Sequence, residues 1–342
     1  MIKRLFIKKV FFFFFLFVYG KLKANDILIN FSKDYNEDDK NTVIMFDPIF
    51  LNYHLYPGHP EDPRRILYIQ KEFEKRGLAL LFKKIDSKIK VYEWIKTIHT
   101  EEHINSIKKN YKVAFKVAEA AVKAVLSSVD SVMSQQKKNI FCAIRPPGHH
   151  ALNTGKEEGF CYFNNIAIAA KYLQIKYRLN KILIVDWDYH HGNSTEFFFY
   201  DDPSVLFFST HDQFSYPLTG SPKRTGSGKG KGFNINVHLP CGTDDELIIE
   251  KFKKILIPAA ETFKPEIVLL SSGFDSRKDD TLGCFDISDQ GFKNLTKIVM
   301  NIANKHSNDR LVSLLEGGYN LIGNAKAAAS HVETLINYKV NE

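Results

Sequence analysis

The chain has 342 residues, of which 44% are hydrophobic and 25% charged, a globular composition long enough for one large α/β domain or two smaller ones. The formal net charge is +8, but the first 23 residues carry six Lys or Arg residues and no acidic residue, so the remainder carries only +2. No stripe of basic residues interleaved with aromatics follows, and we therefore expect no binding to nucleic acid.

The N-terminal segment has the pattern of an export signal. A basic stretch, MIKRLFIKK, precedes nine apolar residues at 10–18, and Leu22-Lys23-Ala24 resembles a cleavage site. The apolar run is too short for an ordinary membrane span, so we expect none in the mature chain. The pattern predicts a signal peptide at 1–24, a polar linker at 25–42 and export to the periplasm or beyond. A cytoplasmic or membrane-anchored protein is the alternative.

Alternating apolar runs and helix-like stretches occupy the middle and end of the chain. Helix-like stretches lie at 113–134, 164–178, 244–263 and 288–306. The apolar runs are short, rich in Ile, Val, Leu or Phe, and each precedes a polar, glycine-containing turn; they are NIFCAI, KILIVDWD, SVLFFST, EIVLLSS and RLVSLLE. Strands that are buried on both faces have this composition. The alternation predicts an α/β fold with a central, mostly parallel sheet flanked by helices.

The cysteines suggest that this fold is stabilised by its core. Their spacing contains no C-x-x-C pair, and it predicts neither a disulfide framework nor a thiolate zinc site. The four positions are Cys142, Cys161, Cys241 and Cys284.

Chemically active side chains follow directly on the predicted strand ends. Ligands of open α/β sheets bind beyond the carboxyl ends of the strands, so we expect these side chains to meet at one edge. Four separate segments contribute to this convergence, which carries more weight than any single motif. The residues are His149, His150, Asp186, Asp188, His190, Asp275 and Tyr319.

The stretch DWDYHHGN and the next strand end predict a metal site. In an extended segment Asp188 and His190 point the same way, and Asp275 supplies a third ligand. Two carboxylates and one imidazole leave an open position, as catalytic zinc requires. An isolated Asp-x-His would more often cap a helix. A two-metal, ureohydrolase-like centre would need carboxylates where the chain has Gly192 and Arg277.

The adjacent histidines of RPPGHH are candidates for proton transfer beside that metal. A Pro-Pro-Gly turn fixes the direction of His149 and His150, and a buried imidazole needs a partner on its second nitrogen. Asp186 could hold one ring and Asn193 the other. Tyr319 could donate its hydroxyl to a developing oxyanion. A bare His-His pair, or a tyrosine after two glycines, would otherwise be an ordinary surface feature.

These motifs resemble the zinc-dependent histone deacetylase family, with its class II-like, bacterial and acetylpolyamine amidohydrolase members. RPPGHHA, GFCYFNN, DWDYHHGN, SSGFDS and EGGYN occur in the family's order, and HPEDPRR (59–65) and IHTEEHI (98–104) are similar to its N-terminal motifs. The resemblance covers about residues 43–335. It implies a single catalytic domain of the arginase/deacetylase fold over that range.

The resemblance also implies roles for individual residues. One zinc ion would be bound by Asp188, His190 and Asp275, with His150 as general base and acid. His149, paired with Asp186, would assist electrostatically, and Tyr319 would polarise the carbonyl. A structural potassium ion would be bound by Asp186, Asp188, His190 and Ser209, partly through backbone carbonyls. The acyl-lysine tunnel would be lined by Phe160, Gly159, Tyr216 and Leu282.

Departures from the family pattern affect the rim and the substrate. Leu218 stands where the family usually has Gly, and Asn193 is typical of the class II-like branch. Polyamine-specific members carry an acidic gatekeeper where this chain has Leu282, although Asp279 and Asp280 lie nearby. We therefore expect an acetyl-lysine peptide or protein as substrate, with an acetylated small amine as the alternative. A non-catalytic acyl-lysine-binding module would be expected to have lost part of this residue set, and all of it is present.

Overall fold

The computed structural model describes residues 41–85 and 88–338. The expected signal peptide at 1–24 and nearly all of the expected linker at 25–42 lie outside the described residues. Among the described residues, no helix combines the length and hydrophobicity needed to cross a membrane.

A parallel sheet forms the centre of the domain. Its eight strands run in the order β2-β1-β3-β8-β7-β4-β5-β6, and every neighbouring pair is parallel. The prediction of an α/β fold with a mostly parallel sheet is confirmed. The strands are β1 (Thr42–Met45), β2 (Phe82–Lys83), β3 (Asn139–Cys142), β4 (Ile182–Asp186), β5 (Val205–His211), β6 (Asn234–His238), β7 (Ile267–Ser272) and β8 (Leu311–Leu315).

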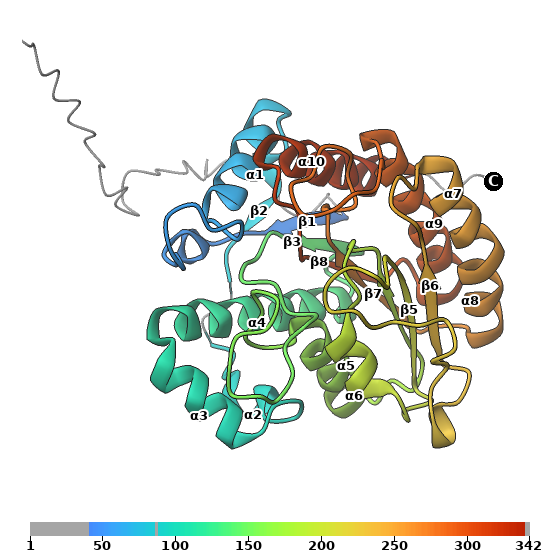
Figure 1. Cartoon of the computed structure of the whole chain (residues 1–342), viewed down its shortest axis with the longest axis horizontal. Helices are drawn as coiled ribbons and strands as arrows, with labels where there is room; N and C mark the ends of the chain where they lie inside the picture. The colour runs from blue at the N-terminus through green and yellow to red at the C-terminus, as the bar shows by residue number, and fades with distance from the viewer. Residues whose placement is uncertain (1–40, 86–87, 339–342) are drawn as a thin grey trace, which may run out of the picture.

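Helices cover both faces of the sheet (Figure 1). The group α2 to α6 lies against one face, and α1, α7, α8, α9 and α10 lie against the other. The helices are α1 (Arg64–Lys75), α2 (Tyr92–Ile95), α3 (Glu101–Asn110), α4 (Lys112–Met133), α5 (Asn165–Lys176), α6 (Asn193–Phe199), α7 (Asp245–Lys251), α8 (Ile257–Phe263), α9 (Asp289–Ser307) and α10 (Leu321–Asn337). A short π-helical stretch, Phe252–Leu256, joins α7 to α8, so the predicted helix at 244–263 is nearly continuous.

Burial on both faces explains why the central strands could be predicted from the sequence. Every residue of β3, β4, β5, β7 and β8 is buried, because helices cover both of their faces. Capping residues set several helix starts: the Ser288 hydroxyl accepts a hydrogen bond from the Gly291 N–H (3.1 Å), and the Asn164 side chain accepts one from the Ala167 N–H (2.8 Å). The buried hydrophobic residues of the strands and of the helices that cover them belong to one core cluster.

Two cysteines depart from the expectation based on spacing. Cys241, after β6, and Cys284, after β7, form a disulfide with their Cα atoms 5.2 Å apart, whereas Cys142 and Cys161 are buried and free. The pair is separated by 43 residues in sequence, so only the adjacency of two loops in the fold brings it together.

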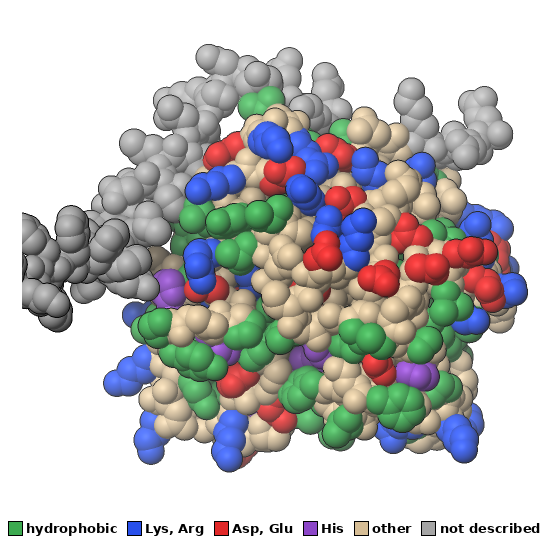
Figure 2. Space-filling view, turned by 45° about the horizontal axis from the view of Figure 1, so that its top comes forward, with side chains coloured by type: hydrophobic (Ala, Val, Ile, Leu, Met, Phe, Trp, Pro, Cys, Tyr) green, Lys and Arg blue, Asp and Glu red, His purple; other side chains and the backbone are tan. Residues whose placement is uncertain are grey.

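The surface carries mixed charge. On the face in Figure 2, basic and acidic side chains are interspersed with apolar and neutral groups. This distribution agrees with the small net charge that remains once the N-terminal 23 residues are set aside.

Candidate active site

Four neighbouring strands deliver the candidate residues to one edge of the sheet. The strands β3, β8, β7 and β4 are adjacent in that order. The RPPGHH turn follows β3, the EGGY turn follows β8, the GFDS turn follows β7, and the DWDYHH segment follows β4. Because all four strands are parallel, their carboxyl ends meet at this edge and their turns converge.

Asp188, His190 and Asp275 form a cluster able to bind a metal ion. Their potential ligand atoms all lie within 4.8 Å of one another, and all three residues are buried. The His190 Nδ1 atom is 2.9 Å from Asp275 Oδ2 and 3.2 Å from Asp188 Oδ1. Two carboxylate groups and one imidazole match the donor set and the open fourth position of a catalytic zinc site.

Glycine residues allow the chain to pass close to these carboxylates. A Cβ atom on Gly273 would lie 2.0 Å from Asp188 Oδ2, and one on Gly317 would lie 2.1 Å from Asp275 Oδ2. The Gly317 N–H also donates to Asp188 Oδ2 at 2.8 Å. The backbone therefore closes around the metal-binding carboxylates at distances that no other residue type would allow.

Negative charge is concentrated in this water-excluded region. Burial, reinforced by Asp188, raises the pKa of Asp275 to about 7, and burial raises the pKa of Asp186 and brings that of Glu316 to about 7. Buried carboxylates are expensive unless they are paired or bind a cation. The cluster thus fits a divalent cation by its electrostatics as well as by its donor atoms.

The two adjacent histidines are held by different partners. His149 Nδ1 is 3.0 Å from Asp186 Oδ2, whereas His150 Nδ1 is 2.8 Å from Asn193 Oδ1, and the two ring centroids are 4.0 Å apart. Burial lowers the pKa of His149, but the Asp188 and Asp186 carboxylates outweigh it and the pKa rises to about 10. Burial, followed by the nearby His149 and His190, lowers the pKa of His150 well below its ordinary value. One imidazole is thus kept charged and the other neutral.

Tyr319 follows the two glycines of the EGGY turn and is buried. Its ring lies 5.7 Å from the Phe160 ring, and the Arg65 guanidinium carbon lies 5.0 Å from its centroid. Burial and the Asp275 carboxylate raise the pKa of its phenol well above the ordinary value. The hydroxyl therefore stays protonated and can donate a hydrogen bond.

Aromatic rings and one glycine flank the approach to the site. Gly159 has φ +52°, and a Cβ atom there would lie 2.4 Å from His150 Cδ2 and 2.8 Å from Tyr216 Cε1, so the position requires glycine. Phe160 packs against Tyr319, and the ring centroid of Tyr216 lies 5.0 Å from that of His150. Leu282 is 39% exposed at the surface.

The rim departs from the family pattern at Leu218. This leucine has φ +65° and is 73% exposed. A left-handed backbone at this place explains why glycine is the usual family residue. The change adds an exposed apolar side chain two residues after Tyr216.

Ser209, expected near a potassium ion, lies opposite Asp186 in the pairing of β5 with β4. Both residues are fully buried. The Ser209 hydroxyl lies 2.8 Å from His211 Nδ1 and donates to it, so its oxygen lone pairs and its backbone carbonyl are the groups to consider for a cation.

Several residues that support the site were not assigned roles from the sequence. The Glu316 carboxylate accepts from the Gly148 N–H (2.6 Å) and from the Ser271 hydroxyl (3.0 Å), and so fixes the histidine turn to β7. Glu61 is fully buried and pairs with both Arg65 (3.2 Å) and Arg145 (2.6 Å). An acid at the end of an apolar strand, and charges within HPEDPRR, were the signals that could have indicated these roles.

The fold and the site together define a class of enzyme. A parallel α/β domain that carries a buried two-carboxylate, one-imidazole cluster beside a histidine pair and a protonated tyrosine has the groups of a metal-dependent hydrolase.

Comparison with known proteins identifies the family. The family described as "Histone deacetylase domain" matches residues 59–335. The chain is 33% identical over 300 residues to a probable deacetylase from Archaeoglobus fulgidus, covering 82% of each protein. It is 33% identical over 325 residues to the polyamine deacetylase HDAC10 of Danio rerio, covering 86% of this chain but 47% of that protein. The solved HDA15 HD domain superposes with a TM-score of 0.80 at 29% identity, covering 88% of this chain and 90% of that structure.

The chain belongs to the histone deacetylase family. It is a deacetylase, an amide hydrolase of a family that depends on zinc.

Substitution of Asp275 by Asn should remove the metal. The amide is nearly the same size but lacks the negative charge, so we expect zinc affinity to fall by more than about 100-fold, because loss of an outer partner alone costs 10–100-fold. Zinc content after dialysis against a competing chelator measures this. Asp286→Asn, at an exposed position, is the matched control and should keep its zinc. Stoichiometric zinc in folded Asp275→Asn would contradict the assignment.

Proposed function

We propose that this protein removes acetyl or other short acyl groups from lysine side chains, using one zinc ion bound by Asp188, His190 and Asp275. The observation that carries the proposal is the convergence of this cluster with the histidine pair and Tyr319 at one sheet edge. When bound, zinc would acidify a water molecule and polarise the acyl carbonyl. The remaining steps fall to the side chains of the chain itself.

His150 is the residue suited to move the proton. Its Nδ1–H donates to the Asn193 oxygen, which leaves Nε2 unprotonated and free to accept a proton from the attacking water. The low pKa of His150 keeps the ring neutral before the reaction. The same nitrogen then returns the proton to the departing lysine amine, so His150 acts first as base and then as acid.

His149 and Tyr319 stabilise the charges that develop. The imidazolium of His149, held by Asp186 at 3.0 Å, lies beside His150 and favours the attack of an anionic oxygen. The protonated phenol of Tyr319 donates a hydrogen bond to the carbonyl oxygen as it becomes negative. Asp186 therefore acts on the reaction by fixing the direction and the charge of His149.

The charges near Leu282 favour acyl-lysine in a peptide over an acetylated polyamine. Leu282 offers no carboxylate to a cationic substrate. The Asp279 side chain is 75% exposed and lies 4.0 Å from Arg277, and both oxygens of Asp280 accept backbone hydrogen bonds. Neither of these two carboxylates is thus both buried and free to pair with a secondary ammonium group of a polyamine. The peptide reading also agrees with exposed apolar groups such as Tyr216 and Leu218.

Two further proposals concern a second cation and export of the protein. The family resemblance and the facing positions of Asp186 and Ser209 support a structural potassium ion held by Asp186, Asp188, His190 and Ser209, partly through their backbone carbonyls. The sequence pattern of residues 1–24 supports export of the protein through a signal peptide. An exported enzyme would meet acylated proteins other than histones.

The substrate class is tested by measuring amine release from an acetyl-lysine peptide and from acetylated putrescine and spermidine in parallel. We expect chelator-sensitive turnover with a higher kcat/KM on the peptide. A higher kcat/KM on the polyamines would move the assignment to polyamine deacetylation. Absence of turnover on all of them by zinc-loaded protein would contradict the removal of acetyl groups.

The substitution Leu282→Glu should shift this preference. A carboxylate at the rim would attract the ammonium group of N-acetylspermidine, and an exposed ion pair of this kind is worth up to about 1 kcal/mol, or about 5-fold in kcat/KM. The ratio of the two kcat/KM values measures the effect, which should shrink at high salt. Leu282→Gln has the same size without the charge and should leave the ratio near that of the native protein. Equal ratios for Glu and Gln would contradict an electrostatic gate here.

The substitution Tyr319→Phe should lower kcat by about 100- to 1000-fold, the cost of removing one oxyanion donor. Zinc content should stay normal, because Tyr319 is outside the cluster of ligands. Tyr92→Phe, on α2 at the surface, serves as control and should retain activity. Full turnover by Tyr319→Phe would show that the phenol does not stabilise the oxyanion.

A further inference from the structure

A loop beside the approach to the site is bonded to the turn that carries Tyr319. We call residues 279–284, DDTLGC, the mouth segment; it follows the Asp275 turn and contains Leu282. We propose that Asp280 is a positioning residue that sets the place of Tyr319 and couples it to the mouth segment. The proposal rests on the catalytic role that the proposed function gives to Tyr319.

The Asp280 carboxylate is shared between the two loops. Its Oδ2 atom accepts from the backbone N–H of Tyr319 at 2.7 Å and from that of Asn320 at 3.0 Å. Its Oδ1 atom accepts from the N–H of Leu282 at 2.9 Å and from that of Gly283 at 3.3 Å. One side chain thus holds the turn of the mouth segment with one oxygen and the tyrosine turn with the other.

The tyrosine turn needs an acceptor from outside. Helix α10 begins at Leu321, so the N–H groups of Tyr319 and Asn320 precede it, and the Asn320 side chain is used to cap the helix at the Gly323 N–H (2.9 Å). Gly318 has φ +120°, which turns the chain away from β8. Backbone donors that are largely removed from water must find a partner, and Asp280 provides it for both.

A reciprocal bond strengthens the connection. The Asn320 amide donates to the Asp279 carbonyl at 2.8 Å, so three hydrogen bonds join the mouth segment to the turn at Tyr319 and Asn320. The Asp279 carboxylate itself does not face this turn; it lies 4.0 Å from Arg277 and is 75% exposed. The two neighbouring aspartates therefore have different tasks despite identical charge.

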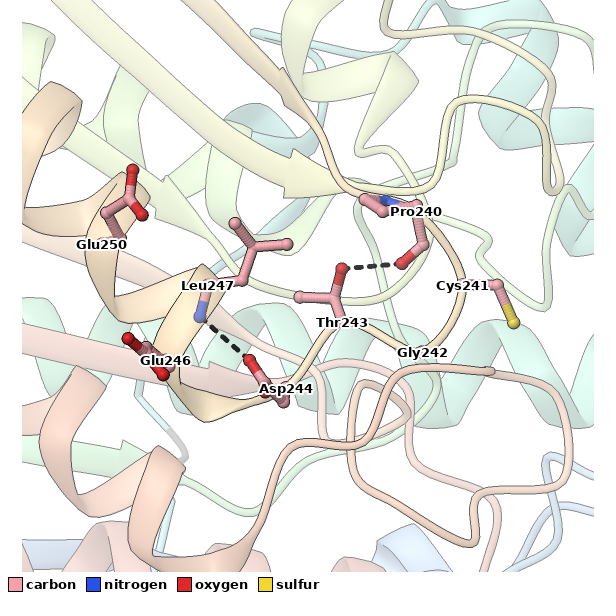
Figure 3. A pocket seen from close by; sticks show the side chains of 8 residues that line it. All are labelled: Pro240, Cys241, Gly242, Thr243, Asp244, Glu246, Leu247 and Glu250. Carbon is pink, nitrogen blue, oxygen red and sulfur yellow. Dashed lines mark hydrogen bonds between the residues drawn. The ribbon is translucent and has the colours of Figure 1, made fainter.

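The mouth segment is a firm anchor because two contacts hold its C-terminal end. A Cβ atom on Gly283 would lie 1.9 Å from the Asp275 carbonyl oxygen, which shows how closely the segment packs on the metal-ligand turn. The next residue, Cys284, is bonded to Cys241, and its carbonyl accepts from the Gly242 N–H at 2.7 Å. Cys241 and Gly242 belong to the turn before α7, where the Thr243 hydroxyl donates to the Pro240 carbonyl at 2.6 Å and Asp244 caps the helix (Figure 3).

These contacts lead us to expect that Asp280 affects the rate of the chemical step. The Asp280 oxygens accept hydrogen bonds from four backbone N–H groups, all of them in the mouth segment or the tyrosine turn. Its loss should displace the Tyr319 hydroxyl from the position of the developing oxyanion. A misplacement of this kind lowers kcat while substrate binding changes little.

The test compares Asp280→Asn with Asp279→Asn, which removes the same charge one residue away. We expect Asp280→Asn to lower kcat on an acetyl-lysine peptide by about 10- to 100-fold, with KM within about 3-fold and zinc content unchanged. Asp279→Asn should stay within about 2-fold of the native kcat. Urea unfolding midpoints establish that each variant is folded, and Asp280→Ser, whose hydroxyl is too short to bridge the loops, replaces Asp280→Asn if that variant does not fold.

A double variant separates positioning from general destabilisation. In the Tyr319→Phe background, Asp280→Asn should lower the residual kcat by less than about 3-fold, because the hydroxyl that it positions is already missing. An equal loss in both backgrounds, or a native kcat in a folded Asp280 variant, would overturn the proposal. Native kcat in Tyr319→Phe would instead overturn the role of the phenol in the proposed function, whatever Asp280→Asn does.

Discussion

Removing several carboxylates from water at one sheet edge is the constraint on which the rest of this structure depends. Each buried acid needs donors or a cation, and each receives backbone or side-chain donors from another segment. Asp188 accepts from Gly317, Glu316 accepts from Gly148, and Asp275 accepts from the Tyr189 N–H at 2.9 Å. The acids therefore hold the turns together as well as forming the metal site, and a bound cation would complete the compensation.

Close backbone approach follows from this constraint. Gly317 and Gly273 let two turns contact the carboxylates directly, and Gly159 lets a third segment pass between His150 and Tyr216. With no side chain at these places, the backbone packs directly on the buried carboxylates and imidazoles. Strong electrostatic effects, such as the opposite pKa shifts of His149 and His150, are the consequence of that burial.

The acidic side chains of Asp280 and Glu61 already form hydrogen bonds or ion pairs within the protein. Asp280 bonds the mouth segment to the tyrosine turn, and Glu61 forms ion pairs with both Arg65 and Arg145. Leu282 and Leu218 leave apolar groups on the surface in their place. The residues that the family resemblance singles out for catalysis and metal binding thus lie in the buried layer, whereas Leu218 and Leu282 are exposed at the surface.

Local sequence determined the α/β class and the chemistry of the candidate residues. Strands β3, β4, β5, β7 and β8 could be predicted because burial on both faces requires continuous apolar runs, while β2 has two residues and β6, NINVH, includes polar side chains, so neither gives such a signal. Tertiary structure alone decided which turns are neighbours. The order β3-β8-β7-β4 places Glu316 under the histidine turn and Asp280 beside Tyr319, and the path of the loops after β6 and β7 brings Cys241 next to Cys284. Such contacts depend on how strands are ordered across the sheet, and patterns of local hydrophobicity do not encode that order.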